Sequence, residues 1–321
     1  MLPSGMHLVR RLCLIGAVAV LGTATSLAKE QPPEIPGWLR SHVGDDHGQI
    51  ARVVLQRARA LYLKKVTEGV VRNPCYFAMD ATRPNEGKRF YTICEADKTF
   101  RAVTTGHGSG RKVKGANFAN GRSCVKNFGN ALDSYLTTGG AYVTAETRTS
   151  FKGYYRSGKQ DALLMRSFVQ FEGEGETANA RERAIGGHAA VLLRQIRYRY
   201  MPKSPHANEN GCVPVGALED YSGGRSNGCT TWTRSDADRI VPLLKDATTV
   251  YIYPESADIK AVAQAVSARK TLASDSAYWN AACLRQIGVP KFWSRESLEP
   301  LLAKFRSDAE PTPRRAAICK P

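Results

Sequence analysis

The cysteines constrain this chain more than any other residue type, because its N-terminal segment predicts that they fold in an oxidising compartment. Residues 1–28 carry the basic pair Arg10 and Arg11, an apolar stretch over residues 12–21, and the small residues Ser26-Leu27-Ala28, which suit cleavage of a secretory signal. We therefore expect an exported protein of the periplasm or cell envelope. The apolar stretch is short for a transmembrane helix, and an uncleaved anchor is the alternative. After cleavage, no other segment predicts insertion into a membrane.

Seven of the eight cysteines follow the signal segment. An odd number in an oxidising compartment predicts three disulfides and one free thiol. The pairing that we expect is Cys75 with Cys94, Cys124 with Cys212, and Cys283 with Cys319. Cys229 is then the free thiol. The alternative is that Cys229 is paired and that another cysteine is free.

The stretch Arg225-Ser226-Asn227-Gly228-Cys229-Thr230-Thr231 predicts a small polar loop. A helix start at 235–238 and a strand at 249–253 follow it in the chain. A thiol presented on such a loop is a candidate nucleophile, whereas a thiol inside an apolar run is more often inert. The nucleophile hypothesis requires a base within hydrogen-bond reach of the sulfur.

Two of the five histidines beyond the signal segment are candidates for that base. His107 and His188 both follow an expected strand and have glycine neighbours, which allow close backbone approach. His42 and His47 lie in a polar N-terminal region, and His206 lies in a Pro-rich connection. The residues by themselves do not choose between His107 and His188.

The hydrophobic pattern predicts a mainly β protein with α additions (α+β). Four segments are expected: a signal peptide over 1–28, a linker and helix over 29–69, a β-rich central domain over 70–255, and a helical extension over 256–321. Residues 192–224 contain several Pro and Gly, and they predict a long connection without secondary structure. Residues 308–321 predict coil. The expected elements are a helix over 46–67, strands over 75–80, 88–94, 99–105, 141–144, 163–165 and 249–253, and helices over 257–269, 275–287 and 295–307.

The charge of the chain indicates an acidic partner. The formal net charge is +17, while 42% hydrophobic and 23% charged residues are typical of a globular protein rather than a disordered one. Lys and Arg are spread along the chain, and no aromatic-basic module for nucleic acid is present in the sequence. We therefore expect an acidic envelope surface or substrate, and no nucleic acid.

The ordered set of motifs resembles the L,D-transpeptidase catalytic domain (YkuD-type), in its murein L,D-transpeptidase branch. The cysteine loop and the glycine-flanked His188 carry the resemblance, together with upstream stretches in the same order over roughly residues 70–255. The upstream stretches are Asp80-x-x-Arg83-Pro84, Lys88-Arg89-Phe90-Tyr91, His107-Gly108-x-Gly110, 115–120, 141–144 and Arg183-Ala184-Ile185-x-x-His188-Ala189. The resemblance implies a β-sandwich or open-barrel core with helices at both ends.

The resemblance also implies roles for the loop residues. Cys229 is the implied nucleophile and His188 the base, with the carbonyl of Ala189 orienting the imidazole. Backbone N–H groups around Gly228 and Cys229 form the implied oxyanion site, Asn227 belongs to the same loop, and Ser226 shapes the loop. Arg225 stabilises the thiolate or binds a substrate carboxylate. His107 is expected to support the site from behind, and neither a metal nor a cofactor is expected.

By the same resemblance, the substrates are the stem peptides of peptidoglycan. Cys229 is expected to form a thioester that an amine on another stem resolves, which makes the chain an L,D-transpeptidase. Resolution by water makes it an L,D-carboxypeptidase or other cysteine peptidase instead. The third alternative is a basic wall-binding protein without catalysis, because Asn227 and Thr231 replace the histidine and arginine of many members and the span from His188 to Cys229 is long.

Overall fold

The computed structural model describes residues 33–308 and 319, apart from 223 and 273–276. The expected signal peptide, the first part of the linker and most of the C-terminal coil lie outside the described residues. The described residues belong to one compact unit, Pro32–Pro321. The domain boundaries expected near 70 and 255 stay predictions.

A ten-stranded sheet organises the described part of the chain. Its main path runs β14-β10-β9-β8-β15-β1-β2-β3, and β12 joins it by pairing with β8 while β11 pairs with β12. Among the described residues the two ends of the path, β14 and β3, do not pair with each other, so the sheet is open. The sheet strands are β1 (Cys75–Asp80), β2 (Phe90–Cys94), β3 (Thr99–Val103), β8 (Gly140–Ser157), β9 (Gln160–Gly173), β10 (Gly186–Ala189), β11 (Val191–Tyr200), β12 (Cys212–Asp220), β14 (Thr230–Trp232) and β15 (Thr249–Tyr253).

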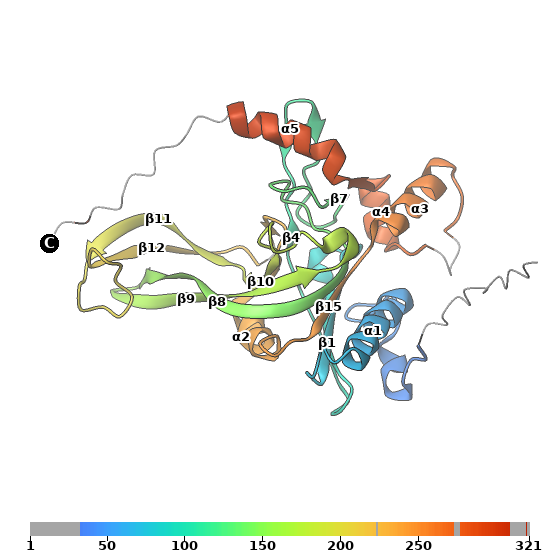
Figure 1. Cartoon of the computed structure of the whole chain (residues 1–321), viewed down its shortest axis with the longest axis horizontal. Coiled ribbons are helices and arrows are strands. Elements are labelled where there is room, and N and C mark those ends of the chain that lie inside the picture. The colour runs from blue at the N-terminus through green and yellow to red at the C-terminus, as the bar shows by residue number, and fades with distance from the viewer. Residues whose placement is uncertain (1–32, 223, 273–276, 309–318, 320–321) are drawn as a thin grey trace, which may run out of the picture. The chain divides into compact units, whose positions relative to one another are not determined.

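The remaining elements are short strands and helices around the sheet (Figure 1). The short strands are β4 (His107–Gly108), β5 (Lys112–Val113), β6 (Ala116–Asn117), β7 (Asn127–Gly129), β13 (Arg225–Ser226) and β16 (Lys291–Trp293). The α-helices are α1 (Arg52–Thr67), α2 (Arg234–Leu243), α3 (Ser256–Ser267), α4 (Ala281–Ile287) and α5 (Arg295–Asp308), and 3-10 turns lie at Gly37–His42, Asn85–Gly87 and Gly175–Thr177. This is the mainly β core with helical additions that the sequence predicts.

Strands β1, β2 and β15 are buried on both faces because their side chains alternate between two cores. On one face Tyr76, Tyr91 and Tyr251 pack with Leu55 of α1. On the other face Phe77, Phe90 and Val250 pack with residues of α2 and α3. This double coverage explains why the three strands are nearly continuous apolar runs.

The prediction of a long connection over 192–224 is wrong. Those residues form most of the hairpin β11–β12, whose strands pair from Val191 with Asp220 to Tyr200 with Cys212. Pro202, Pro205 and Gly211 do lie in the turn, as their types predict. Pro214, however, lies inside β12, where it pairs opposite Tyr198. The prediction treated every Pro and Gly of the stretch as evidence for a loop. It did not recognise the strand pattern of the residues between them.

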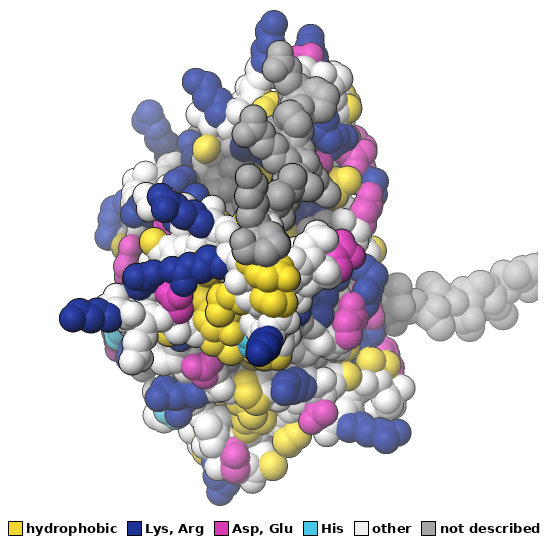
Figure 2. Space-filling view, turned by 90° about the vertical axis from the view of Figure 1, so that its left-hand side faces the viewer, with side chains coloured by type: hydrophobic (Ala, Val, Ile, Leu, Met, Phe, Trp, Pro, Cys, Tyr) yellow, Lys and Arg dark blue, Asp and Glu magenta, His cyan; other side chains and the backbone are white. Residues whose placement is uncertain are grey.

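The hairpins β8–β9 and β11–β12 extend together beyond the rest of the sheet (Figure 1). Figure 2 looks at this end of the molecule and shows apolar side chains gathered near the middle of the face, with Lys and Arg side chains around them. Exposed apolar residues of these strands are Leu163, Met165, Ile196, Tyr198 and Tyr200.

One of the three predicted disulfides is confirmed and two are wrong. Cys75 and Cys94 are bonded directly across β1 and β2, with 4.1 Å between their Cα atoms. Cys124 is bonded to Cys283, and Cys212 to Cys319. The side chain of Asn280 caps α4, and this helix carries Cys283 to Cys124, which the order of cysteines in the chain does not reveal. Cys229 is the free cysteine among the described residues, as predicted.

Candidate active site

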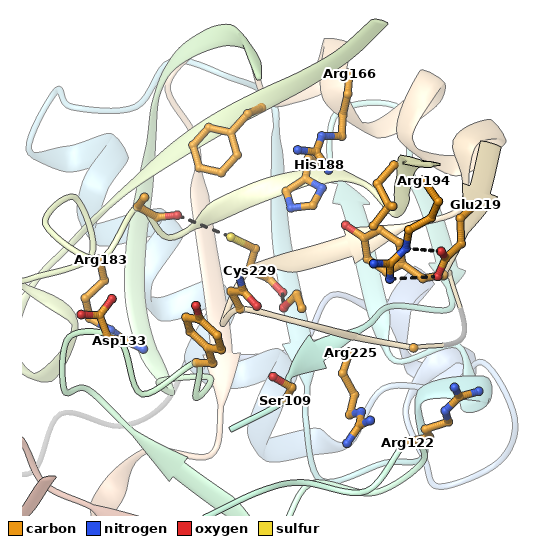
Figure 3. Close-up of a pocket in the computed structure, with 18 of the residues that line it drawn as sticks. Ser109, Arg122, Asp133, Arg166, Arg183, His188, Arg194, Glu219, Arg225 and Cys229 are labelled. Atoms are coloured by element: carbon orange, nitrogen blue, oxygen red, sulfur yellow. Dashed lines mark hydrogen bonds and ion pairs between the residues drawn. The ribbon is translucent and has the colours of Figure 1, made fainter. Parts of the chain in front are cut away.

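An open cavity of about 770 Å³ lies where the cysteine loop meets β9, β10 and the hairpin β11–β12 (Figure 3). Cys229 and His188 both line it, and their side chains lie near each other in Figure 3. The predicted residues Arg225, Ser226 and Asn227 also line it. The other lining residues are Ser109, Arg122, Leu132, Asp133, Tyr135, Arg166, Phe168, Arg183, Ala184, Leu192, Arg194, Glu219, Tyr221 and Gly224.

Two parallel strand pairs hold the cysteine loop in place. Before Cys229, β13 pairs with β4, and after it β14 pairs with β10. Between the two pairs, Ser226 Oγ donates to the carbonyl of Cys229 over 2.6 Å and accepts from the N–H of Gly228 over 3.1 Å. Ser226 therefore links two residues of the cysteine loop, Gly228 and Cys229.

Both the backbone conformation and the surroundings of Gly228 disfavour any residue with a Cβ atom. Its φ of +113° lies in a region that L-residues rarely adopt. A Cβ atom there would lie 2.9 Å from Ile185 Cδ1 and 3.0 Å from the carbonyl oxygen of Leu136. The conformation of the loop just before Cys229 therefore requires glycine at position 228.

The thiol of Cys229 is buried and makes a hydrogen bond to a backbone carbonyl. The residue is 9% exposed, and its Sγ donates to the carbonyl of Ala184 over 3.4 Å, which Figure 3 marks with a dashed line. Burial raises the pKa of the thiol above its usual value. A hydrogen bond from the backbone of Gly186 and the charges of Arg183 and Arg166 oppose that rise without reversing it.

His188 is a neutral imidazole, and one of its ring nitrogens makes a hydrogen bond to a backbone carbonyl. Its Nδ1 lies 2.7 Å from the carbonyl oxygen of Ala189, an acceptor, so Nδ1 carries the proton and Nε2 has the lone pair. Burial lowers the pKa of His188 to about 4, against the partial opposition of that hydrogen bond. The register of β10 with β14 pairs His188 with Thr231, two residues past Cys229. The structure thus brings together the cysteine, the histidine and the Ala189 carbonyl.

His107 lies behind the cavity and does not line it. The side chain is fully buried, with Nδ1 accepting from Arg89 over 2.7 Å and Nε2 donating to the carbonyl of Gly121 over 3.0 Å. Burial and the charge of Arg89 hold the pKa of His107 well below its usual range. Because both ring nitrogens are used and β4 pairs with β13, His107 supports the strand that leads into the cysteine loop.

The cavity is strongly cationic. Five arginines line it, and its two acids already have partners: Glu219 is paired with Arg194, and Asp133 with Arg306 at 2.9 Å. The guanidinium of Arg225 donates to the carbonyl of Asn120 over 2.7 Å. The arginines whose charge acts on the Cys229 thiol are Arg183 and Arg166, rather than Arg225.

Arg183 is one of the site residues that sequence reasoning missed. Its Nη2 donates to the carbonyl of Leu136 over 2.6 Å, and its Nη1 donates to Thr138 Oγ1. It lies five residues before His188, inside a stretch that resembles the family, so a signal was present in the sequence. Proximity in the chain favoured Arg225 instead, because it lies four residues before Cys229.

The comparisons with known proteins identify the family. The L,D-transpeptidase catalytic domain matches residues 47–253, which is more than half of the chain, and the chain therefore belongs to this family. A crystal structure of an L,D-transpeptidase (Yku) from Stackebrandtia nassauensis is similar at 13% sequence identity and a TM-score of 0.26. The match covers 56% of this chain and 55% of that one, so it spans about half of that protein's length. No curated protein matches the chain.

The matched region contains Cys229, His188 and His107 and ends at the last residue of β15. The helices α3, α4 and α5 lie beyond it. Within the described residues, no helix is both long and apolar enough to cross a membrane. No group of three or more His, Cys, Asp or Glu side chains in that part of the chain is arranged to hold a metal ion.

Proposed function

We propose that this chain is an exported L,D-transpeptidase that acts on peptidoglycan stem peptides, with Cys229 as nucleophile and His188 as general base. One observation carries the proposal. A buried thiol and a neutral imidazole line the same cavity, and the Ala189 carbonyl holds the imidazole as the tautomer whose Nε2 can accept a proton. A nucleophile, a base and a group that orients the base are the three parts that thiol acyl transfer needs.

Proton transfer and attack are coupled in this mechanism. The resting pair is a thiol and a neutral imidazole, since burial raises the pKa of Cys229 and lowers that of His188. When the substrate carbonyl reaches Sγ, His188 Nε2 takes the thiol proton as the S–C bond forms. The negative charge that develops on the carbonyl oxygen requires a backbone donor. The Gly228 N–H already donates to Ser226 Oγ, so we assign this role to the Cys229 N–H.

The remaining steps use the proton that His188 has taken from the thiol. The C–N bond to the terminal D-residue breaks, and its amine leaves with the proton that His188 returns. The product is a thioester on Cys229. An amine of a second stem attacks the thioester, its proton passes by way of His188 to the sulfur as the C–S bond breaks, and a cross-link forms. Water in place of the amine gives carboxypeptidase activity from the same residues.

The charge of the cavity supports an anionic peptide as donor. Glu219 and Asp133 are both neutralised by arginine partners, which leaves Arg122, Arg166 and Arg225 to attract carboxylates. The three disulfides support an oxidising compartment and hence export. Cys229 is free while the other described cysteines form disulfides, as expected for a catalytic cysteine.

The test is incubation of the mature protein with purified stem peptides, followed by mass spectrometry. We expect an acyl adduct on Cys229, cross-linked dimers as products, and neither from Cys229→Ala. Trimmed stems without dimers would establish the carboxypeptidase instead. A wild-type protein that binds stems but forms no adduct would refute catalysis and leave the wall-binding alternative.

A further inference from the structure

One wall of the cavity has an unusual backbone. Residues 131–136 form this wall, and both Asp133 and Tyr135 line the cavity. Asp133 has a φ of +61° and Tyr135 a φ of +60°. Residues other than glycine rarely adopt such left-handed conformations, and they persist only where the surroundings enforce them. The neighbours that hold this wall therefore matter for the shape of the site.

Helix α5 provides those neighbours. Leu298 and Leu302 of α5 are fully buried in one cluster with Ala131 and Leu136 of the wall. Arg306 forms an ion pair with Asp133 at 2.9 Å. The guanidinium of Arg111 lies over the ring of Tyr135 at 3.7 Å and over that of Phe305 in α5 at 5.0 Å. Each left-handed wall residue is thus tied to α5, directly or through one side chain.

The wall separates the active-site cavity from a second hollow beneath α5. That hollow has a volume of about 580 Å³ and is lined by Leu132, Glu182 and six residues of α5. Leu132 lines both cavities. At the start of α5, Arg295 lies 3.8 Å from Glu182, the residue before Arg183. The helix therefore contacts the active-site region at both of its ends.

A displacement of the wall would reach the cysteine loop. The carbonyl of Leu136 accepts from Arg183, whose charge acts on the Cys229 thiol. The same carbonyl faces Gly228, where it leaves no room for a Cβ atom. Figure 3 shows Asp133 and Arg183 together on one side of Cys229, across the cavity from Arg194 and Glu219.

The ion pair with α5 also sets the charge of the wall. Without Arg306, Asp133 would present an unpaired carboxylate in a cavity that is otherwise cationic. An anionic substrate would then meet repulsion at that wall and attraction elsewhere.

We propose that α5, which lies beyond the region shared with the family, is a specificity-determining element of the active site. It holds the wall residues Asp133 and Tyr135 in their left-handed conformations and neutralises Asp133, so that the cavity admits an anionic donor peptide. Leu302, Phe305 and Arg306 are positioning residues that act through the wall. The identity of the donor rests on the proposed function, whereas the mechanical role of α5 does not.

The first test compares the same leucine-to-alanine substitution at two buried positions. Leu302→Ala removes one of the two buried leucines that pack α5 in the cluster with the wall, and Leu55→Ala removes an equally buried leucine from the core beneath α1. We expect Leu302→Ala to increase hydrogen exchange of the amides of 131–138 and to raise KM for the stem peptide about tenfold, which corresponds to about 1.4 kcal/mol. Leu55→Ala should lower Tm comparably and change neither quantity.

The second test removes one positive charge from α5 without removing a buried side chain. Arg306→Gln and Lys304→Gln each remove one cation from the exposed side of α5, but Lys304 forms no ion pair within the described residues. We expect Arg306→Gln to raise KM about threefold with kcat and Tm unchanged, because exposed pairs contribute 1 kcal/mol or less. Adding Asp133→Asn should restore KM, and Lys304→Gln should leave it unchanged.

These outcomes separate the two proposals. Absence of an acyl adduct in the wild type refutes the transpeptidase, and the exchange comparison then decides the role of α5 alone. Equal exchange at 131–138 in Leu302→Ala and Leu55→Ala overturns the role of α5 even where catalysis is established. An unchanged KM in both Leu302→Ala and Arg306→Gln overturns it as well.

Discussion

Replacement of Gly228 by alanine should strain the cysteine loop and slow the chemistry at Cys229. The φ of +113° is unfavourable for any residue with a Cβ atom, and such conformations cost about 1–3 kcal/mol. The new Cβ would also meet Ile185 Cδ1 at 2.9 Å and the Leu136 carbonyl at 3.0 Å. The Ile185 side chain can rotate away, but the carbonyl is backbone and is held by Arg183. Relief therefore has to come from the loop itself.

A shift of the loop displaces the residue that follows Gly228, which is Cys229. Because misplacement of a reacting group by about 1 Å can cost about 100-fold in rate, we expect kcat/KM for thioester formation to fall by about that factor. We also expect the free energy of unfolding to fall by about 2–3 kcal/mol, of which the backbone strain accounts for most. Rapid-quench mass spectrometry of the acyl adduct measures the rate, and urea unfolding measures the stability.

Two other glycines provide controls for the separate contributions. Gly69 has a φ of +72° but no atom within 4 Å of an added Cβ, so Gly69→Ala introduces strain without a clash. Gly37 has neither a positive φ nor a neighbour within 4 Å, so Gly37→Ala introduces neither. Both variants should acylate at the wild-type rate. A Gly228→Ala protein whose rate stays within threefold of wild type would refute the argument that this close approach positions Cys229.

Three further predictions concern proton transfer, charge and thiols. Acylation should be lost as pH falls through about 4, since burial lowers the pKa of His188 to that value and only its neutral form accepts the thiol proton; a loss centred near 6.5 would contradict this. Arg183→Gln should raise the midpoint of the pH-dependent alkylation of Cys229 by iodoacetamide, and Arg225→Gln should not, because the charge of Arg183 acts on the thiol. Thiol titration of the denatured, unreduced mature protein should give one free thiol, and three would exclude the disulfide set.

Local patterns in the sequence predicted much of the candidate site. The cysteine loop, the glycine-flanked His188 and the strands around them are encoded within a few residues of each other. The odd cysteine count predicted one free thiol without any knowledge of the fold, and Cys229 is that thiol although two of the three expected pairings are wrong. Cys75 and Cys94 were paired correctly for a similar reason, since two short strands joined by a turn bring them opposite each other.

The errors come from contacts between distant parts of the chain. Nothing near Cys124 indicates that α4 will dock against it, so the order of cysteines gave the wrong partner. Arg183 was missed because it lies far from Cys229 in the chain, just before the strand β10 that pairs with β14. The wall residues Asp133 and Tyr135 were missed because their conformation depends on α5, which follows them by more than 150 residues.

The order of the disulfides in the chain has a consequence for biogenesis. In a chain that is exported from its N-terminus, Cys124, Cys212 and Cys229 emerge before either Cys283 or Cys319. Once Cys75 and Cys94 are bonded to each other, the first three thiols have only one another as partners during that interval, and any bond that forms among them is non-native. Completion of the native set then requires exchange of such bonds, a process of seconds to hours unless an isomerase catalyses it. The yield of active protein should therefore depend on disulfide isomerase in the receiving compartment.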